Sequence, residues 1–210
     1  MDEDPLSGAP TQVSELSPSE YKSIVARDPK APRLGPYLLQ HRLGTGGMAE
    51  VFLAFSDAEG SNREQVVVKR ILPGYAMHDR YREMFRREAA LAVGLDHPNI
   101  VKVHALLDEG NDVGIVMEYL EGLTLYDMAV RSWRGGRALP IEPMLRTFID
   151  AAHALDYAHG LTDDSGRPRN LVHRDVSPDN LLLTKQGITK LLDFGVARAE
   201  DLVSLTRTGQ

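Results

Sequence analysis

The stretch His173-Arg174-Asp175-Val176-Ser177-Pro178-Asp179-Asn180 is followed, thirteen residues after Asn180, by Asp193-Phe194-Gly195. Both stretches offer carboxylate or amide oxygens, the ligands that a hard cation prefers, in a form suited to metal-assisted phosphoryl transfer. Short apolar runs at residues 170–172, 181–183 and 191–192 adjoin them and predict buried strands, from which the polar groups would project. Either triplet alone is a common chance match or an ordinary strand exit, so the prediction depends on their order and spacing.

A glycine-rich segment lies between two strand-like runs near the start of the chain. Gly44, Gly46 and Gly47 separate the run at residues 37–43 from the run at residues 51–55. Glycines let the backbone come close to phosphate oxygens and offer N–H donors, which larger residues would hinder. A plain hairpin turn has the same composition, so the segment alone leaves both interpretations open.

Two ionisable residues in the next elements are candidates for one cleft. Lys69 closes the β-branched run Val66-Val67-Val68, so its ammonium is expected at a strand end over a cleft. Residues 79–95 carry an apolar stripe near the 3.6-residue period and predict a helix with Glu88 on its inner side. An inward carboxylate needs a partner, which Lys69 would supply. Without Lys69, Glu88 would be an ordinary surface glutamate.

Taken together, these motifs resemble the signature set of the eukaryotic-like protein kinases, most closely the bacterial serine/threonine members. The resemblance covers about residues 37–210 and implies an α+β, two-lobed protein-kinase-like fold. Residues 37–120 would form the nucleotide-binding lobe, a small antiparallel sheet with one helix. Residues 121–210 would form part of a mostly helical lobe, with the catalytic loop and the start of the activation segment. Residues 1–36, which hold six of the twelve prolines, would be a flexible leader.

The resemblance further implies ATP and Mg²⁺ as cofactors and assigns roles to single residues. Lys69 would contact the α- and β-phosphates and Glu88, Asp175 would accept the proton of the substrate hydroxyl, and Asn180 and Asp193 would hold Mg²⁺. The expected nucleotide-binding residues are Gly44, Gly46, Gly47, Val51, Lys69, Glu118, Leu120 and Asp127. Met117, near the end of the strand-like run 113–120, would be the gatekeeper of the adenine pocket, and Arg174 would meet a phosphate on the activation loop.

Two positions depart from the family pattern. Ala49 replaces the third loop glycine, at small cost because alanine is small. Ser177 stands where serine/threonine kinases usually carry a lysine that touches the γ-phosphate, and loss of one such donor typically slows a reaction about a hundred- to a thousandfold. We therefore expect a slower or differently tuned site.

The resemblance leaves two classes of function open. The favoured one is a Mg-ATP-dependent kinase that phosphorylates a serine or threonine hydroxyl of a protein. The alternative is a catalytically weak or inactive nucleotide-binding scaffold, which Ser177 and the lack of an Ala-Pro-Glu-like motif after Gly195 favour. Ser204, Thr206 and Thr208 follow Asp-Phe-Gly and are candidates for autophosphorylation with accompanying self-association, or else are solvated loop hydroxyls.

Composition excludes several other classes. A formal charge of −6 argues against nucleic-acid binding, and no apolar run approaches the ~18 residues of a membrane span. The chain has no cysteine for disulfides or thiolate-bound metals, and its seven histidines lack a paired metal-ligand spacing. The acidic start is unlike a signal peptide, so we expect a cytoplasmic protein.

Two helical patterns remain. Ser17-Pro18-Ser19-Glu20 is a capping box that predicts a short helix, which either docks on the folded body or frays. The helix predicted at residues 143–159 is apolar on most sides, so we expect it to leave an apolar patch exposed if the chain ends at residue 210.

Overall fold

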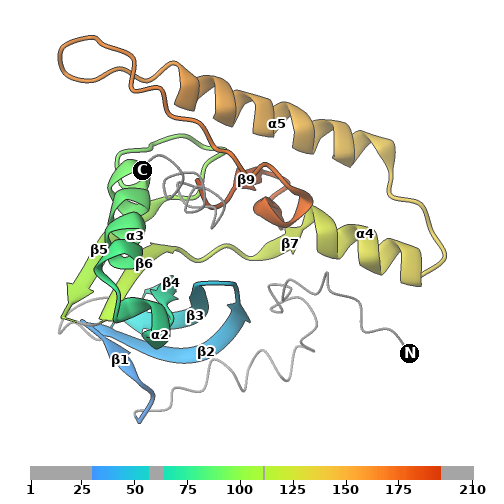
Figure 1. Ribbon diagram of the computed structural model, residues 1–210. Coiled ribbons are helices and arrows are strands. Elements are labelled where there is room, and N and C mark those ends of the chain that lie inside the picture. Colours follow the sequence, from blue (N-terminus) through green and yellow to red (C-terminus); the bar gives the residue numbers. More distant parts are fainter. Residues whose placement is uncertain (1–29, 57–63, 111, 195–210) are drawn as a thin grey trace, which may run out of the picture.

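The computed structural model describes residues 30–56, 64–110 and 112–194, which fold into two lobes. The first lobe is a six-stranded antiparallel sheet in the order β1-β2-β3-β4-β6-β5, with a long helix beside it (Figure 1). Its strands are β1 (Arg33–Leu34), β2 (Tyr37–Thr45), β3 (Ala49–Ser56), β4 (Gln65–Ile71), β5 (Val103–Glu109) and β6 (Asp112–Glu118). The strands predicted from sequence in this lobe all belong to the sheet.

Helices α2 (Pro73–Ala76) and α3 (Asp79–Ala92) follow β4. The apolar stripe of α3 packs on the sheet, where Phe85 and Ala89 join a core that includes Val103 and Ile115. Burial of this stripe, rather than helix propensity alone, stabilises the helix. The predicted helix is therefore present, although it ends at Ala92 and not at residue 95, and Glu88 is on its buried side.

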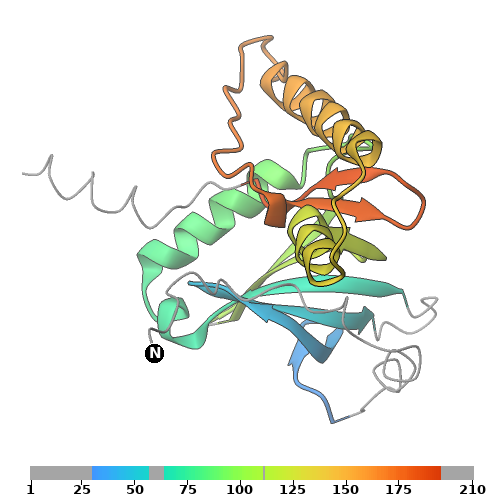
Figure 2. The same ribbon diagram turned by 90° about the vertical axis from the view of Figure 1, so that its right-hand side faces the viewer.

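The second lobe consists of a three-stranded sheet in the order β7-β8-β9 and two helices (Figure 2). Its elements are β7 (Gly122–Thr124), α4 (Leu125–Arg134), α5 (Ile141–His159), the 3-10 turn η1 (Pro178–Asn180), β8 (Leu181–Thr184) and β9 (Thr189–Leu191). The core of this lobe joins α5 to β9 through Ala154, Leu171 and Leu191. None of the helices among the described residues has the length and apolar character that crossing a bilayer requires.

The first lobe begins before the boundary predicted at residue 37. Arg33–Leu34 pairs with β2, and Leu34 is almost fully buried against the sheet. Gly35, with φ at +55°, makes the tight turn that brings β1 back onto β2. The sequence did not predict this strand, because two residues are too few to show a strand periodicity and the surrounding segment is rich in proline.

The strand predicted at residues 170–172 is absent. Leu171 is buried, but Val172 is half exposed and Asn170 has φ at +50°, which an extended strand does not tolerate. The segment forms no ladder, so its apolar residues anchor a loop instead. The predictions at residues 181–183 and 191–192 correspond to β8 and to the end of β9.

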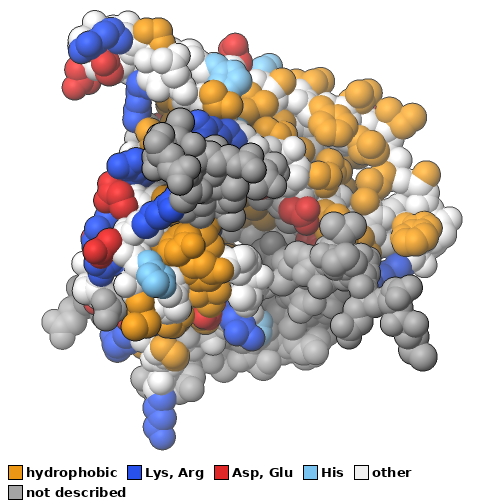
Figure 3. Space-filling view, in the orientation of Figure 1, with side chains coloured by type: hydrophobic (Ala, Val, Ile, Leu, Met, Phe, Trp, Pro, Cys, Tyr) orange, Lys and Arg blue, Asp and Glu red, His pale blue; other side chains and the backbone are white. Residues whose placement is uncertain are grey.

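Helix α5 leaves an apolar side exposed, as the sequence predicts. Ile141, Leu145, Phe148 and Ile149 keep 49–73% of their surface exposed, whereas Ala151, Ala154 and Ala158 are buried. Figure 3 shows hydrophobic side chains gathered over this part of the molecule. The predicted helix near residue 17 and the hydroxyls of Ser204, Thr206 and Thr208 lie outside the described residues.

Gly122 provides a test of the packing between β7 and β8. A Cβ at this position would lie 2.3 Å from the Leu183 carbonyl oxygen, so the backbone would have to move. We expect Gly122→Ala to lower the free energy of unfolding by about 1–3 kcal/mol, measured by thermal or urea denaturation. Gly74→Ala is the control, since a Cβ at residue 74 would meet no atom within 4 Å and the helix should gain up to about 1 kcal/mol. Equal effects of the two substitutions would contradict the close approach of β7 to β8.

Candidate active site

A cleft of about 480 Å³ lies between the two lobes, a volume typical of small-molecule sites. It is lined by the β2–β3 hairpin, β4, the segment after β6, the start of α4 and the loops next to β8 and β9. Eleven of the site residues predicted from sequence line it, namely Gly44, Gly46, Val51, Lys69, Met117, Glu118, Leu120, Asp127, Asp175, Asn180 and Asp193. Gly47 does not line the cleft, and Glu88 lies behind it.

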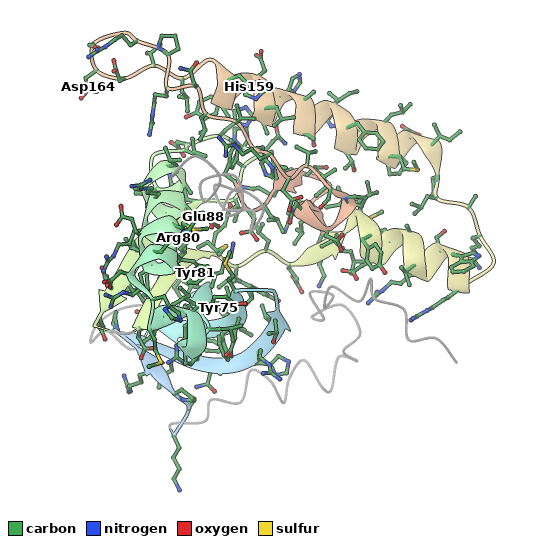
Figure 4. The ribbon with its side chains drawn as sticks, viewed as in Figure 1. Tyr75, Arg80, Tyr81, Glu88, His159 and Asp164 are labelled. Atoms are coloured by element: carbon green, nitrogen blue, oxygen red, sulfur yellow. The ribbon has the colours of Figure 1, made fainter. Side chains whose placement is uncertain are left out.

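Three charged side chains from three elements meet at the inner end of the cleft. The Lys69 Nζ atom on β4 lies 2.7 Å from Glu88 Oε1 on α3 and 3.2 Å from Asp193 Oδ1, two residues after β9. Figure 4 shows Glu88 on α3. The side chains of Lys69 and Glu88 are only 15% and 11% exposed, so solvent screens this pair little.

Burial and charge act in opposite directions on this group. Burial by itself lowers the pKa of Lys69, but the carboxylates of Asp193 and Glu88 outweigh it and raise the pKa of the ammonium above its usual value. Burial raises the pKa of Glu88, and the nearby Lys69 charge opposes that rise. Lys69 is therefore a permanent cation at neutral pH, and its surplus of carboxylate neighbours leaves the cleft able to accept a further cation.

His173 supports the loop that carries Asp175. Its ring is 1% exposed, its Nε2 atom lies 2.8 Å from the Leu192 carbonyl oxygen, and it packs on Phe194 with 4.6 Å between ring centroids. Burial lowers the pKa of His173, so the neutral ring donates from Nε2 to that carbonyl. The Asp175 backbone N–H donates to His173 Nδ1 at 3.3 Å, which completes the link between the two loops.

Asn180 orients the Asp175 carboxylate. Its Nδ2 group donates to the Asp175 main-chain oxygen at 2.9 Å and to Oδ2 at 3.1 Å. With the amide nitrogen engaged in this way, the Asn180 Oδ1 atom is left as an oxygen ligand. The Leu192 backbone N–H donates to the Asn180 main-chain oxygen at 2.9 Å, so Asn180 and Asp193 are held on adjacent segments.

The glycine-rich segment is a hairpin turn that borders the cleft. The Gly46 N–H donates to the Ala49 carbonyl oxygen at 2.8 Å, and pairing of β2 with β3 is irregular between Arg42 and Gly44. The segment is therefore a hairpin turn, and its position on the cleft is also compatible with binding phosphate. Ala49 lies within β3 without positive φ, so the replaced glycine leaves no strain there.

Asp179 was not singled out from the sequence, although it lines the cleft together with Asp127 and Asp175. Partial burial and repulsion from Asp127 and Asp175 raise its pKa. Its position between Asp175 and Asn180 could have indicated that Asp179 lies at the site. The other unpredicted cleft residues resemble ordinary core or loop residues in sequence; they are Leu43, Thr45, Val67, Val101, Tyr119, Gly122, Thr124, Tyr126, Leu182 and Leu192.

Asp127 and Met117 both line the cleft. Thr124 caps α4 by accepting from the Asp127 backbone N–H at 3.0 Å, and its hydroxyl donates to Asp127 Oδ2 at 2.9 Å. Met117 lines both the cleft and a small inner cavity of about 20 Å³ that Glu88 and Phe194 also border. Met117 therefore lies at the boundary between the cleft and this inner cavity, as Val101 and Asp193 do.

The donor set fits Mg²⁺ better than a metal held by protein alone. Among the described residues no cluster of three or more His, Asp or Glu side chains could hold a metal ion. Mg²⁺ usually takes one or two protein oxygens and completes its shell with water and substrate phosphates. The Asp193 carboxylate, which is 40% exposed, and the Asn180 amide oxygen meet that requirement.

Comparisons with known proteins agree with this geometry. The sequence profile described as protein tyrosine and serine/threonine kinase matches residues 38–209. The chain belongs to the protein kinase family. Its sequence is 47% identical over 176 residues to the tyrosine-protein kinase MasK of Myxococcus xanthus, covering 83% of this chain and 27% of MasK. It is 34% identical over 176 residues to the serine/threonine-protein kinase PrkC of Bacillus subtilis, covering 83% and 24%.

The fold is likewise that of a protein kinase. The crystal structure of the PknI kinase domain of Mycobacterium tuberculosis matches with a TM-score of 0.64 and 30% identity, covering 82% of this chain and 64% of the PknI chain. The two-lobed fold and the resemblance to bacterial eukaryotic-like kinases, both predicted from the motifs, are confirmed. The chain spans about a quarter of the length of MasK and PrkC.

Substitution of Lys69 tests the charge balance in the cleft. In Lys69→Met the buried Glu88 carboxylate loses its 2.7 Å partner, and we expect the free energy of unfolding to fall by about 1–3 kcal/mol. The double variant Lys69→Met with Glu88→Leu should regain part of that loss, because the buried Glu88 carboxylate is then removed and only the half-exposed Asp193 carboxylate lacks Lys69. Arg87→Met is the control, since its exposed pair with Glu83 contributes less than about 1 kcal/mol. Urea denaturation compares the unmodified chain with Lys69→Met, Glu88→Leu, the double variant and Arg87→Met. A double variant whose loss of stability equals the sum of the losses in Lys69→Met and Glu88→Leu would argue against this balance.

Proposed function

We propose that this chain binds Mg-ATP and transfers the γ-phosphate to a hydroxyl group of a protein substrate, in the manner of bacterial serine/threonine kinases. One observation carries the proposal: Lys69, Asp175, Asn180 and Asp193 line a single cleft, with Lys69 in contact with both Glu88 and Asp193. Phosphoryl transfer needs mostly positioning and charge neutralisation, and this set of groups offers both.

The nucleotide would lie along the cleft from the segment after β6 to the glycine-rich hairpin. Glu118 and Leu120 would present main-chain groups to the adenine, which Val51 would cover, and Asp127 would bind the ribose. The phosphates would lie near Lys69 and under the hairpin, whose residues are Gly44, Gly46 and Gly47. Support comes from their shared position on the cleft wall, Gly47 excepted.

Asp175 would position the acceptor hydroxyl and take its proton, because Asn180 holds the carboxylate in one orientation. Asn180 and Asp193 would hold Mg²⁺, which supplies neutralisation of charge on the phosphate oxygens. Lys69 would add a second positive charge, and Glu88 would keep the ammonium in place.

A tyrosine acceptor is a second candidate, because MasK, at 47% identity, is named a tyrosine-protein kinase. Ser177 also stands where serine/threonine kinases usually carry a lysine. Most of the other similar proteins are named serine/threonine kinases, which favours those acceptors. Phosphoamino-acid analysis of a labelled protein substrate separates the two candidates.

Asp175→Asn tests the proposed base. We expect kcat for transfer to a protein substrate to fall about a hundred- to ten-thousandfold, while the affinity for Mg-ADP stays within about twofold. Radiolabelled ATP and mass spectrometry of the substrate and of Ser204, Thr206 and Thr208 measure transfer and autophosphorylation. Asp164→Asn is the matched control, because Asp164 is exposed on the loop after α5, away from the cleft (Figure 4).

Three outcomes of that experiment separate the functions. Equal transfer by Asp175→Asn would exclude the proposed base. Nucleotide binding without transfer in the unmodified chain would favour the scaffold alternative. Absence of nucleotide binding would contradict both.

Ser177→Lys tests whether the missing lysine limits the rate. A lysine here would restore a donor to charge that develops on the transferred phosphate, so we expect kcat to rise about tenfold. Ser177→Ala is the comparison, with a change of less than about threefold if the hydroxyl contributes little. A rate that is unchanged in Ser177→Lys would show that this position does not limit catalysis.

A further inference from the structure

Glu118, the last residue of β6, turns its carboxylate away from the groups that line the cleft. Its Oε1 atom accepts from the Lys102 backbone N–H at 2.8 Å and from Lys190 Nζ at 2.7 Å. Neither Lys102 nor Lys190 lines the cleft, whereas Glu118 does. The carboxylate of Glu118 is thus held by two residues that do not themselves line the cleft.

Lys190 comes from the other lobe and is held firmly. It is the middle residue of β9, and both of its neighbours bind the segment that leads into β5. The Leu191 N–H donates to the Asn99 main-chain oxygen at 2.8 Å, and Asn99 Nδ2 donates to the Thr189 oxygen at 2.9 Å. Lys190 Nζ also donates to the Ile100 oxygen at 3.3 Å. The ammonium is therefore a fixed point of the second lobe.

A closed ring of contacts results. The Glu118 N–H donates to the Lys102 oxygen at 2.9 Å, and the Lys102 N–H returns a bond to the Glu118 carboxylate. Lys190 joins this pair to β9, three residues before Asp193. The side chains of Lys190 and Glu118 are only 16% and 27% exposed, so the ion pair is weakly screened.

We infer that the Lys190–Glu118 ion pair is an interlobe tether that positions the nucleotide-binding segment after β6 relative to Asp193, with Lys190 as a positioning residue. The inference rests on the proposed nucleotide site. Residues 119–121 between β6 and β7 have no regular structure, so the chain itself sets their position only loosely. This ion pair thus holds the adenine end of the cleft against β9, in addition to the Lys69–Asp193 pair at the metal end. Its loss lowers affinity for nucleotide more than it lowers the rate of transfer.

Lys190→Gln and Glu118→Gln test the tether in the whole 210-residue chain. The probe is a fluorescent ADP analogue with Mg²⁺, and its Kd is measured beside KM for ATP, kcat and Tm. We expect each variant to raise Kd about fivefold or more, and the double variant to raise it no further, because both remove one interaction. The change in kcat of Lys190→Gln should be less than about twofold, and Lys190→Arg should restore most of the affinity.

Lys185→Gln is the matched control. Lys185 also forms an ion pair across this region, with Glu121, but its side chain is 65% exposed and the pair should contribute little. An unchanged or lower Kd in Lys190→Gln, or additive effects in the double variant, would overturn the tether. If Lys190→Gln does not fold, Glu118→Gln decides alone, since its amide oxygen still accepts from Lys102. Failure of the unmodified chain to bind the probe would instead contradict the proposed function.

Discussion

The arrangement of both lobes depends on one buried ammonium that two carboxylates share. Lys69 comes from the centre of the large sheet, Glu88 from the helix that covers it, and Asp193 from the loop after β9. A charge so little exposed is stable only with partners, so the ion group requires the helix, the sheet and the second lobe to meet at one point. The cleft is the space that remains around that point.

Strand β9 connects this point to the rest of the molecule. Within three residues it binds the segment before β5 through Asn99, helix α5 through Asp150 and β6 through Glu118. The buried Asp150 carboxylate accepts from the Thr189 N–H at 3.1 Å, which satisfies a backbone donor that water does not reach. Because β9 is fixed by these contacts, Asp193 and the loop that carries Asp175 are held in a defined relative position, as a preorganised active site requires.

Much of the candidate site could be predicted from sequence because its chemistry is carried by rare residue types at set spacings. Lys69, Glu88, Asp175, Asn180 and Asp193 all follow from the ordered motifs, and the structure brings them together. Asp179 was missed, and so were several apolar cleft residues such as Val67 and Leu182, because the same side-chain types line a cleft and fill a core. Residues 170–172 were assigned to a strand for a similar reason: apolar composition does not reveal a positive φ such as that of Asn170.

The sequence by itself determined the kinase family, the helix at α3, the central strands and the identity of the charged groups, because local periodicity and ordered motifs are properties of the chain alone. Only the tertiary structure decided which groups meet: that β1 joins the sheet, that Glu88 lies 2.7 Å from Lys69, and that Glu118 points to Lys190. The two residues of such a pair can lie far apart in the sequence, as Glu118 and Lys190 do at 72 positions. They meet only after the chain has packed, when each buried charge needs a partner of opposite sign.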